Sequence, residues 1–140
     1  MKKLLFLSMT MLMAILSLGL TSCGDDNDEP TDKTDIVGTW KLSGKEDGFT
    51  YTSLIQFTKN GKFYNVEIAE EDGDMEVEVI RGIYSVSNGV ITITEKDEDD
   101  RNIETYSVKY QVKNKQLIIS EGAYSITYNQ AKDSEIEKYL

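Results

Sequence analysis

Two glutamates, Glu76 and Glu78, stand two positions apart in a predicted strand, and their spacing suggests a catalytic pair. Paired carboxylates hydrolyse glycosides as acid and base, and side chains two apart on a strand lie about 7 Å from each other. However, Met75 and Val77 alternate with them and are expected to be buried, which places both glutamates outside. The chain also has no histidine, the commonest general base. We therefore expect no catalytic residue, and a protein that is not an enzyme.

Two dense acidic runs, residues 70–74 and 97–100, are candidates for calcium binding. Calcium takes six to eight oxygen ligands, which carboxylates supply readily. Neither run has the spacing of an EF-hand loop. We expect both runs to be solvated hairpin tips, and the domain to hold no metal and no cofactor.

The only cysteine, Cys23, completes the sequence LTSC after a mainly apolar segment, residues 4–20, that follows two lysines. A basic start, an apolar segment and then small residues form the layout of a secretory signal. An uncleaved membrane anchor is the alternative, because the apolar segment lies at the lower limit of the roughly 17–25 residues that span a bilayer. The small residues before Cys23 favour cleavage there.

The sequence LTSC resembles the lipobox of bacterial lipoproteins, a leucine and two small residues before a cysteine. In that family the thiol is alkylated with diacylglycerol, the signal is cut before the cysteine, and the new amino group is acylated, for example with palmitate. The resemblance implies that residues 1–22 are a signal peptide and that lipidated Cys23 anchors the protein to a lipid membrane. An ordinary signal peptide with an incidental cysteine is the alternative.

Residues 24–34 contain no apolar residue except Pro30 and are expected to form a solvated tether. Asp25, Asp26, Asp28 and Glu29 resemble the acidic export signal that follows the cysteine in some Gram-negative surface lipoproteins. This resemblance implies an outer-membrane lipoprotein displayed on the cell surface, with a periplasm-facing position as the alternative. The domain organisation is therefore residues 1–22 signal, 23–34 lipidated cysteine and tether, and 35–140 one folded domain.

The charge of the chain excludes one class of partner. The formal net charge is −10, and loss of residues 1–22, which carry two lysines and no acid, makes it −12. A surface this negative repels nucleic acid.

Eight strands are predicted in the remaining domain, joined by connections too short for parallel crossovers, which makes the order antiparallel. The Asn60-Gly61, Asp72-Gly73 and Asn88-Gly89 pairs mark tight hairpins. The predicted strands are residues 36–43, 51–58, 62–68, 75–86, 90–94, 105–113, 116–120 and 123–129.

Two further features are predicted, one within the fourth strand and one after the last strand. The long fourth strand changes the parity of its apolar residues, which predicts a bulge near Val79 and Ile80 and a bend at Gly82. A capping-box pattern starting at Ser134 predicts a short C-terminal helix packed on the sheet.

Eight such strands can form an open sheet, a sandwich or a barrel, and closure alone removes the edges that invite aggregation. We expect an all-β, eight-stranded antiparallel up-and-down barrel with a short C-terminal helix.

The segment Gly38-Thr39-Trp40 resembles the Gly-x-Trp motif of lipocalins. Together with IQFTKNGKFYNV, RGIYSVSNGVITI and KYQVKNKQLIIS, in that order, it is similar to the lipocalin-like domains that follow bacterial lipoprotein signals. The resemblance implies a barrel whose tryptophan closes one end. The chain departs from true lipocalins in its shorter length and in having no arginine after Arg101.

The barrel interior is the expected binding site, because aromatic side chains with polar tips suit an amphipathic ligand. The residues expected inside are Trp40, Phe57, Phe63, Tyr84, Tyr106, Tyr110, Tyr124 and Tyr128. A hollow barrel predicts a binder of small apolar or amphipathic molecules. A filled barrel predicts instead an interaction module with an envelope protein as partner. Surface display alone suggests a third function, oligosaccharide binding.

Overall fold

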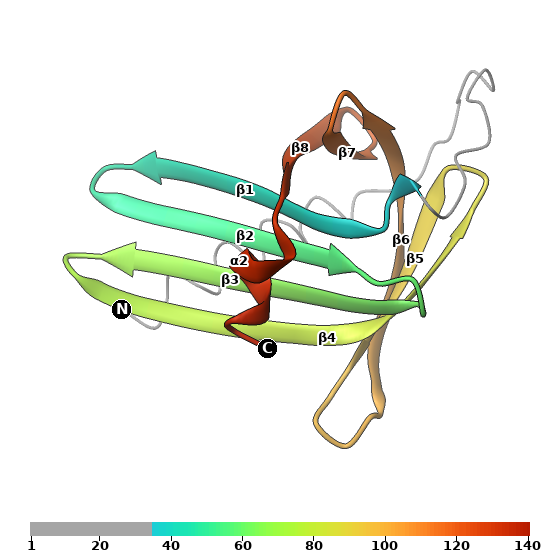
Figure 1. Ribbon diagram of the computed structural model, residues 1–140, viewed down its shortest axis with the longest axis horizontal. Coiled ribbons are helices and arrows are strands. Elements are labelled where there is room, and N and C mark those ends of the chain that lie inside the picture. The colour runs from blue at the N-terminus through green and yellow to red at the C-terminus, as the bar shows by residue number, and fades with distance from the viewer. Residues whose placement is uncertain (1–34) are drawn as a thin grey trace.

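Residues 35–140 are described by a computed structural model (Figure 1), in which the strands close into one antiparallel barrel. Each strand pairs with the next along the chain, and β1 closes the barrel by pairing with β8. The strands are β1 (Gly38–Glu46), β2 (Phe49–Phe57), β3 (Lys62–Glu71), β4 (Asp74–Ser87), β5 (Val90–Lys96), β6 (Asn102–Lys113), β7 (Gln116–Glu121) and β8 (Tyr124–Ala131). The predicted up-and-down barrel is confirmed.

Two of the three predicted tight turns, Asp72-Gly73 and Asn88-Gly89, have the expected two-residue geometry. The prediction for Asn60-Gly61 is wrong: four residues connect β2 to β3, and Gly61 has a positive φ whereas Asn60 does not. Asn88 and Gly89 have φ angles of 51° and 72°, the left-handed region that a two-residue hairpin requires. The same geometry occurs at Asp47 and Gly48, between β1 and β2, where the sequence prediction ended the first strand too early and began the second too late. The Asp-Gly pair was the signal for this hairpin.

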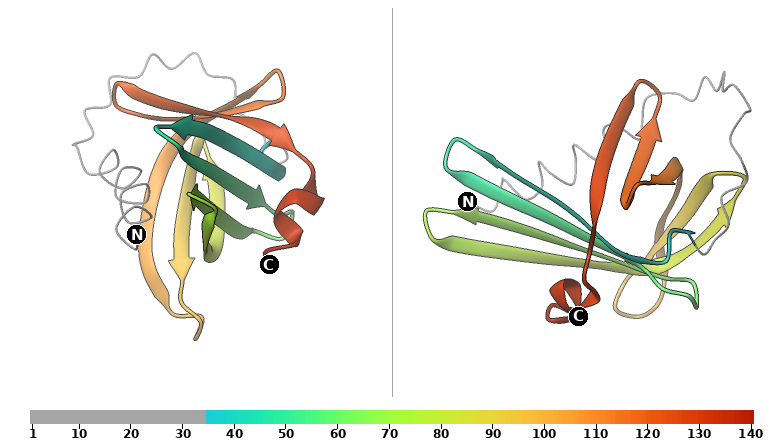
Figure 2. Two further views of the ribbon diagram at one scale, coloured as in Figure 1. Left: turned by 90° about the vertical axis from the view of Figure 1, so that its left-hand side faces the viewer. Right: turned by 45° about the horizontal axis from the view of Figure 1, so that its top comes forward.

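The β1–β2 and β3–β4 hairpins project beyond the rest of the barrel. The β1–β8 pairing covers only Thr39–Lys41 of β1, and the β4–β5 pairing begins at Arg81. The remaining parts of β1 and β4 therefore extend past β8 and β5, as both Figure 1 and the right-hand view of Figure 2 show. This leaves one end of the barrel open on two sides.

The predicted bulge in β4 is wrong. The pairing of β3 with β4 is continuous from Lys62 opposite Ile83 to Glu71 opposite Asp74, and the irregularity lies instead between Glu95 and Lys96, where β5 pairs with β6. Gly82 lies where β4 pairs with β5, and its missing side chain lets the carbonyl oxygen of Thr94 approach closely: a Cβ atom there would lie 2.2 Å from that oxygen. Without the bulge, the parity of the strand does not change.

The apolar core fills the other end of the barrel. Ile36, just before β1, is completely buried there, and the indole Nε1 of Trp40 donates a hydrogen bond to its carbonyl oxygen at 2.9 Å. On the same side, the Tyr84 hydroxyl donates to the carbonyl oxygen of Thr58 at 2.6 Å, and the ring meets Phe57 edge to face. Burial of these rings, each worth roughly 1.5–3 kcal/mol or more, makes this the stable end of the domain.

The helix α2 (Asp133–Glu137) packs on the outer face of β2 and β3, so a second small core lies outside the barrel (Figure 1). Ile136 is completely buried against Leu54 and Val66. Two polar contacts to β1 fix the helix: Thr39 donates to Asp133 at 2.7 Å, and Lys41 pairs with Glu135 at 3.0 Å.

The sequence predicted this helix but placed its start too late. The helix begins at Asp133, and the carboxylate of Glu135 accepts a hydrogen bond from the backbone N–H of Lys132, two residues before the predicted cap at Ser134.

Candidate functional site

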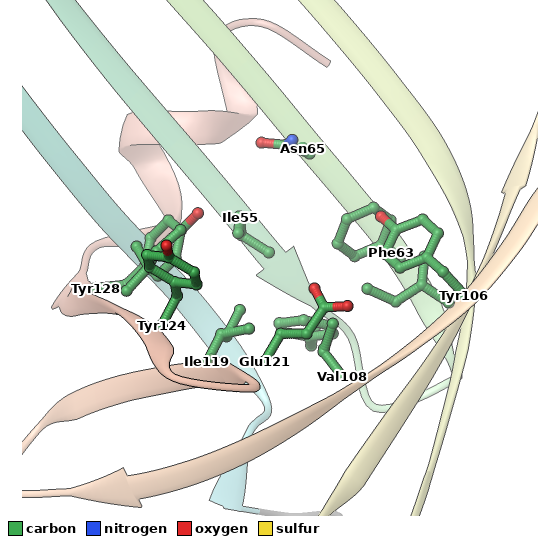
Figure 3. A pocket seen from close by; sticks show the side chains of 12 residues that line it. Ile55, Phe63, Asn65, Tyr106, Val108, Ile119, Glu121, Tyr124 and Tyr128 are labelled. Carbon is green, nitrogen blue, oxygen red and sulfur yellow. The ribbon is translucent and has the colours of Figure 1, made fainter. Parts of the chain in front are cut away.

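A cavity of about 50 Å³ lies inside the barrel, between the packed core and the open end (Figure 3). A water molecule needs roughly 10–15 Å³ by the same measure, so the cavity has room for a few waters or the narrow end of a ligand. The barrel is therefore neither completely filled nor widely hollow. Its lining is mostly apolar and consists of Ile55, Phe57, Phe63, Asn65, Ile93, Tyr106, Val108, Ile119, Glu121, Tyr124, Ile126 and Tyr128.

Five of the eight aromatic residues predicted for the site line this cavity: Phe57, Phe63, Tyr106, Tyr124 and Tyr128. Tyr128 is almost completely buried, whereas Tyr124 is 63 % exposed and lies at the rim.

The other three predicted residues, Trp40, Tyr84 and Tyr110, are buried in the core around the closed end and do not line the cavity. Trp40 therefore fits the role that the family resemblance implies, closing one end of the barrel, rather than that of a ligand contact.

One polar network lies on the wall formed by β2 and β3. Glu67 Oε1 accepts hydrogen bonds from the Ser53 hydroxyl at 2.8 Å and from Asn65 Nδ2 at 3.0 Å. Burial raises the pKa of Glu67 above its usual value, and the carboxylate of Glu78 raises it further, while the two hydrogen bonds act in the opposite direction. Asn65 lines the cavity and so connects it to this carboxylate.

A second carboxylate lies behind Tyr106. The Tyr106 hydroxyl donates to Glu95 Oε1 at 3.0 Å, and Glu95 is only 5 % exposed. Burial raises the pKa of Glu95, and the nearby carboxylates of Glu104 and Glu78 add to this effect. Burial also raises the pKa of Tyr106, followed by the charge of Glu95. Tyr106 thus keeps its proton and donates it to the hydrogen bond.

The third carboxylate, Glu121, lines the cavity itself. Its Oε2 atom is buried without a hydrogen-bond partner, and Figure 3 shows the group directed toward the space between Tyr106 and Tyr124. Burial raises the pKa of this carboxyl group. A buried acceptor without a donor is costly, so this oxygen is the natural place for a ligand to donate a hydrogen bond.

The placement of Glu76 and Glu78 outside the barrel is wrong. Because β4 has no bulge, both share the parity of Ile80, which packs against the inner core, and both are half-buried. Met75 and Val77 occupy the outer face and are 60 % and 40 % exposed.

The carboxylates Glu67, Glu95 and Glu121 were not among the predicted site residues, although the sequence carries a signal for them. Each continues the inward parity of its own strand, after Phe63, Ile93 and Ile119 respectively. The alternation that identifies the buried apolar residues therefore also places these carboxylates inside.

The acidic run at residues 97–100 is organised around a basic side chain. Arg101 pairs with Asp97 at 2.9 Å and with Asp99 at 3.0 Å on the surface. Among residues 35–140, no group of three or more acidic side chains is arranged to hold a metal ion.

Cys23, the signal segment and the acidic tether lie outside the described residues. Within the part of the chain that the structure describes, no helix is both long and apolar enough to cross a membrane.

Comparison with known proteins agrees with this architecture. A family model, described as a lipocalin-like domain, matches residues 36–109, which run from the buried Ile36 into β6 and make up more than half of the chain. No curated protein and no solved structure matches the chain. The matched segment includes Trp40 at the closed end and seven of the twelve cavity-lining residues, which lie on β2, β3, β5 and β6. The chain therefore belongs to the family of lipocalin-like domains.

Proposed function

We propose that this protein is a non-catalytic, membrane-anchored lipoprotein that holds one end of a small amphipathic molecule in its barrel. The cavity carries this proposal, because it is lined by apolar and aromatic side chains and lies beside the open end. Such pockets, mostly apolar with a few convergent polar groups, are typical ligand sites. The small volume favours a narrow ligand, such as an alkyl chain or a single ring.

Binding is tested with N-phenyl-1-naphthylamine, an uncharged dye that fluoresces in apolar surroundings. The full chain carrying Cys23→Ser is used, so that no lipid anchor competes for the dye. We expect saturable fluorescence with one dye per chain. The variant Ile119→Trp fills the cavity and is expected to abolish binding, whereas Ile118→Trp, on the outer face of the same strand, is expected to retain it.

Two results would contradict the proposal. In the first, both tryptophan variants lose the dye; in the second, neither the Cys23→Ser parent nor the Ile118→Trp control binds the dye saturably. The second result would support a filled barrel that acts through its surface. The exposed Met75 and Val77, neighbours on the outer face of the projecting part of β4, would then be the first surface to test for an envelope protein partner.

The anchor is proposed from the sequence LTSC, and the outer face of the outer membrane from the acids that follow it. Several acyl chains hold a protein firmly on a bilayer, whereas one holds it only marginally. We expect Cys23→Ser to move the protein from the membrane to the soluble fraction, and protease added to intact cells to digest the unmodified protein. Unchanged fractionation would contradict lipidation, and full protection from protease would favour the periplasm-facing alternative.

A further inference from the structure

Five carboxylates on neighbouring strands share the inward parity of the cavity-lining residues, and we call them the acidic rim: Glu67, Glu78, Glu95, Glu104 and Glu121. Two pairs of them are directly opposed across neighbouring strands, Glu67 with Glu78 and Glu95 with Glu104. Like charges in direct cross-strand opposition are destabilising. The acidic rim therefore lowers the stability of the empty barrel.

Basic side chains do not neutralise the acidic rim. In the described strands, every lysine and arginine has the parity that points outward, opposite to that of the cavity-lining residues. These residues are Lys41, Lys45, Lys62, Arg81, Lys96, Lys109 and Lys113. The ion pairs of the described region, such as Lys41 with Glu135 and Arg101 with Asp97, also lie on the outer surface.

Each buried member of the acidic rim is connected to the cavity. Glu67 is bonded to Asn65 and Glu95 to Tyr106, and both of these partners line the cavity. Glu121 lines it directly, with its buried Oε2 atom lacking a partner. A donor in the cavity would therefore meet the carboxylate of Glu121 directly, with two further carboxylates bonded to the lining residues Asn65 and Tyr106.

We infer that the ligand is a narrow cationic amphiphile, such as an alkylamine, whose apolar end enters the cavity and whose ammonium group lies at the acidic rim. This inference rests on the proposed function and names the chemical class of its ligand. An ammonium group satisfies the free acceptor of Glu121 and relieves the repulsion between the opposed glutamates. The rings of Tyr106 and Tyr124 beside it favour a cation further.

A metal ion fits the acidic rim less well than an organic cation. The carboxylates are spread over five strands, and no three acidic side chains in residues 35–140 are arranged to hold one ion. A metal also makes no use of the apolar lining, whereas an amphiphile contacts both.

Three ligands with the same unbranched alkyl chain and different head groups test the charge preference of the site directly: decylamine, decanol and decanoate. Binding to the full chain carrying Cys23→Ser is measured by titration calorimetry at about pH 8. We expect decylamine to bind roughly tenfold more tightly than decanol, which corresponds to one charge-assisted hydrogen bond, and decanoate to bind more weakly than either. Ile119→Trp is expected to abolish binding of decylamine, which excludes attraction to the acidic outer surface.

Two variants identify the carboxylates responsible, with one matched control. Glu121→Gln and Glu67→Gln are each expected to weaken decylamine roughly tenfold while leaving decanol unchanged. Glu70→Gln removes the same charge from the outer face of β3 and is expected to leave the affinities for decylamine and decanol unchanged. Circular dichroism verifies that each variant is folded.

The outcomes separate this inference from the proposed function. Equal affinity for decylamine and decanol, or a preference for decanoate, would overturn the cation while leaving the cavity as a binding site. A loss of decylamine binding in Glu70→Gln equal to that in Glu121→Gln would also overturn it. Binding of none of the three molecules would contradict the proposed function itself.

Discussion

Replacing Glu67 by glutamine should make the domain more stable at neutral and higher pH. Glutamine has the same shape and still accepts the hydrogen bonds from Ser53 and Asn65, so the substitution removes the charge and little else. Burial raises the pKa of this carboxyl group, which means that the folded state binds its proton more tightly than the unfolded state. The free energy of unfolding therefore falls as the pH rises from the unfolded value through the raised one.

The size of the effect follows from the contacts of Glu67. Removing the charge relieves the repulsion from Glu78 directly opposite, roughly 0.2–1 kcal/mol, and the desolvation of a carboxylate, several kcal/mol in a protein interior. Against this, two hydrogen bonds to a charged acceptor become neutral ones, a loss of roughly 1 kcal/mol each. We expect a net gain of about 1 kcal/mol, which raises the melting temperature of a domain of this size by about 4–8 °C.

Urea unfolding at about pH 8 and about pH 4 measures this gain, since urea, unlike guanidinium, does not screen charges. At the lower pH most Glu67 side chains carry a proton in both states, so the difference in stability between the two proteins should be much smaller. Glu70→Gln is the control, because Glu70 lies exposed on the outer face of the same strand. Destabilisation of Glu67→Gln at the higher pH, or the same gain in the control, would refute the reasoning.

Two further substitutions test the packing around the barrel. Ile136→Ala should lower the free energy of unfolding, measured in urea, by about 2–4 kcal/mol, because this side chain is completely buried. Leu140 is 42 % exposed, so Leu140→Ala should change it by no more than about 0.5 kcal/mol. Equal losses in the two variants would mean that α2 is not docked on the barrel. Gly82→Ala should lower the free energy of unfolding by about 1–3 kcal/mol, because its Cβ would meet the carbonyl oxygen of Thr94 and force the backbone of β4 or β5 to move. An unchanged melting temperature would show that this close approach is absent in solution.

The two ends of the barrel differ in how their buried polar groups contribute to stability. At the closed end, Trp40, Tyr84 and Ile36 are buried and their polar atoms are hydrogen-bonded within the domain. At the open end, opposed carboxylates and the unpartnered Glu121 oxygen work against stability. Proteins keep such locally unfavourable arrangements mainly at functional sites. This contrast supports the proposal that a ligand binds at the open end.

Much of the fold was predictable from local patterns. Strict alternation, as in residues 105–113, indicates a half-buried strand whatever its partners are, and the Asn-Gly pair at 88–89 requires a tight turn. Short connections between such strands then leave only antiparallel neighbours. The strands and their order were predictable for this reason. The closing role of Trp40 was implied by the resemblance to lipocalins, and the proposed lipidation of Cys23 rests on the sequence alone.

The site depended on the tertiary structure because it is built from residues far apart in the chain. The register of β3 against β4 decides that Glu67 opposes Glu78, and the uninterrupted pairing of β4 decides that Glu78 shares the inward parity of Ile80. Parity along one strand states which side chains share a face but not which face is inside when both carry apolar residues, as in β4. Only barrel closure brings Glu121 of β7 to the same cavity as Asn65 of β3, and this meeting of distant strands creates the acidic rim.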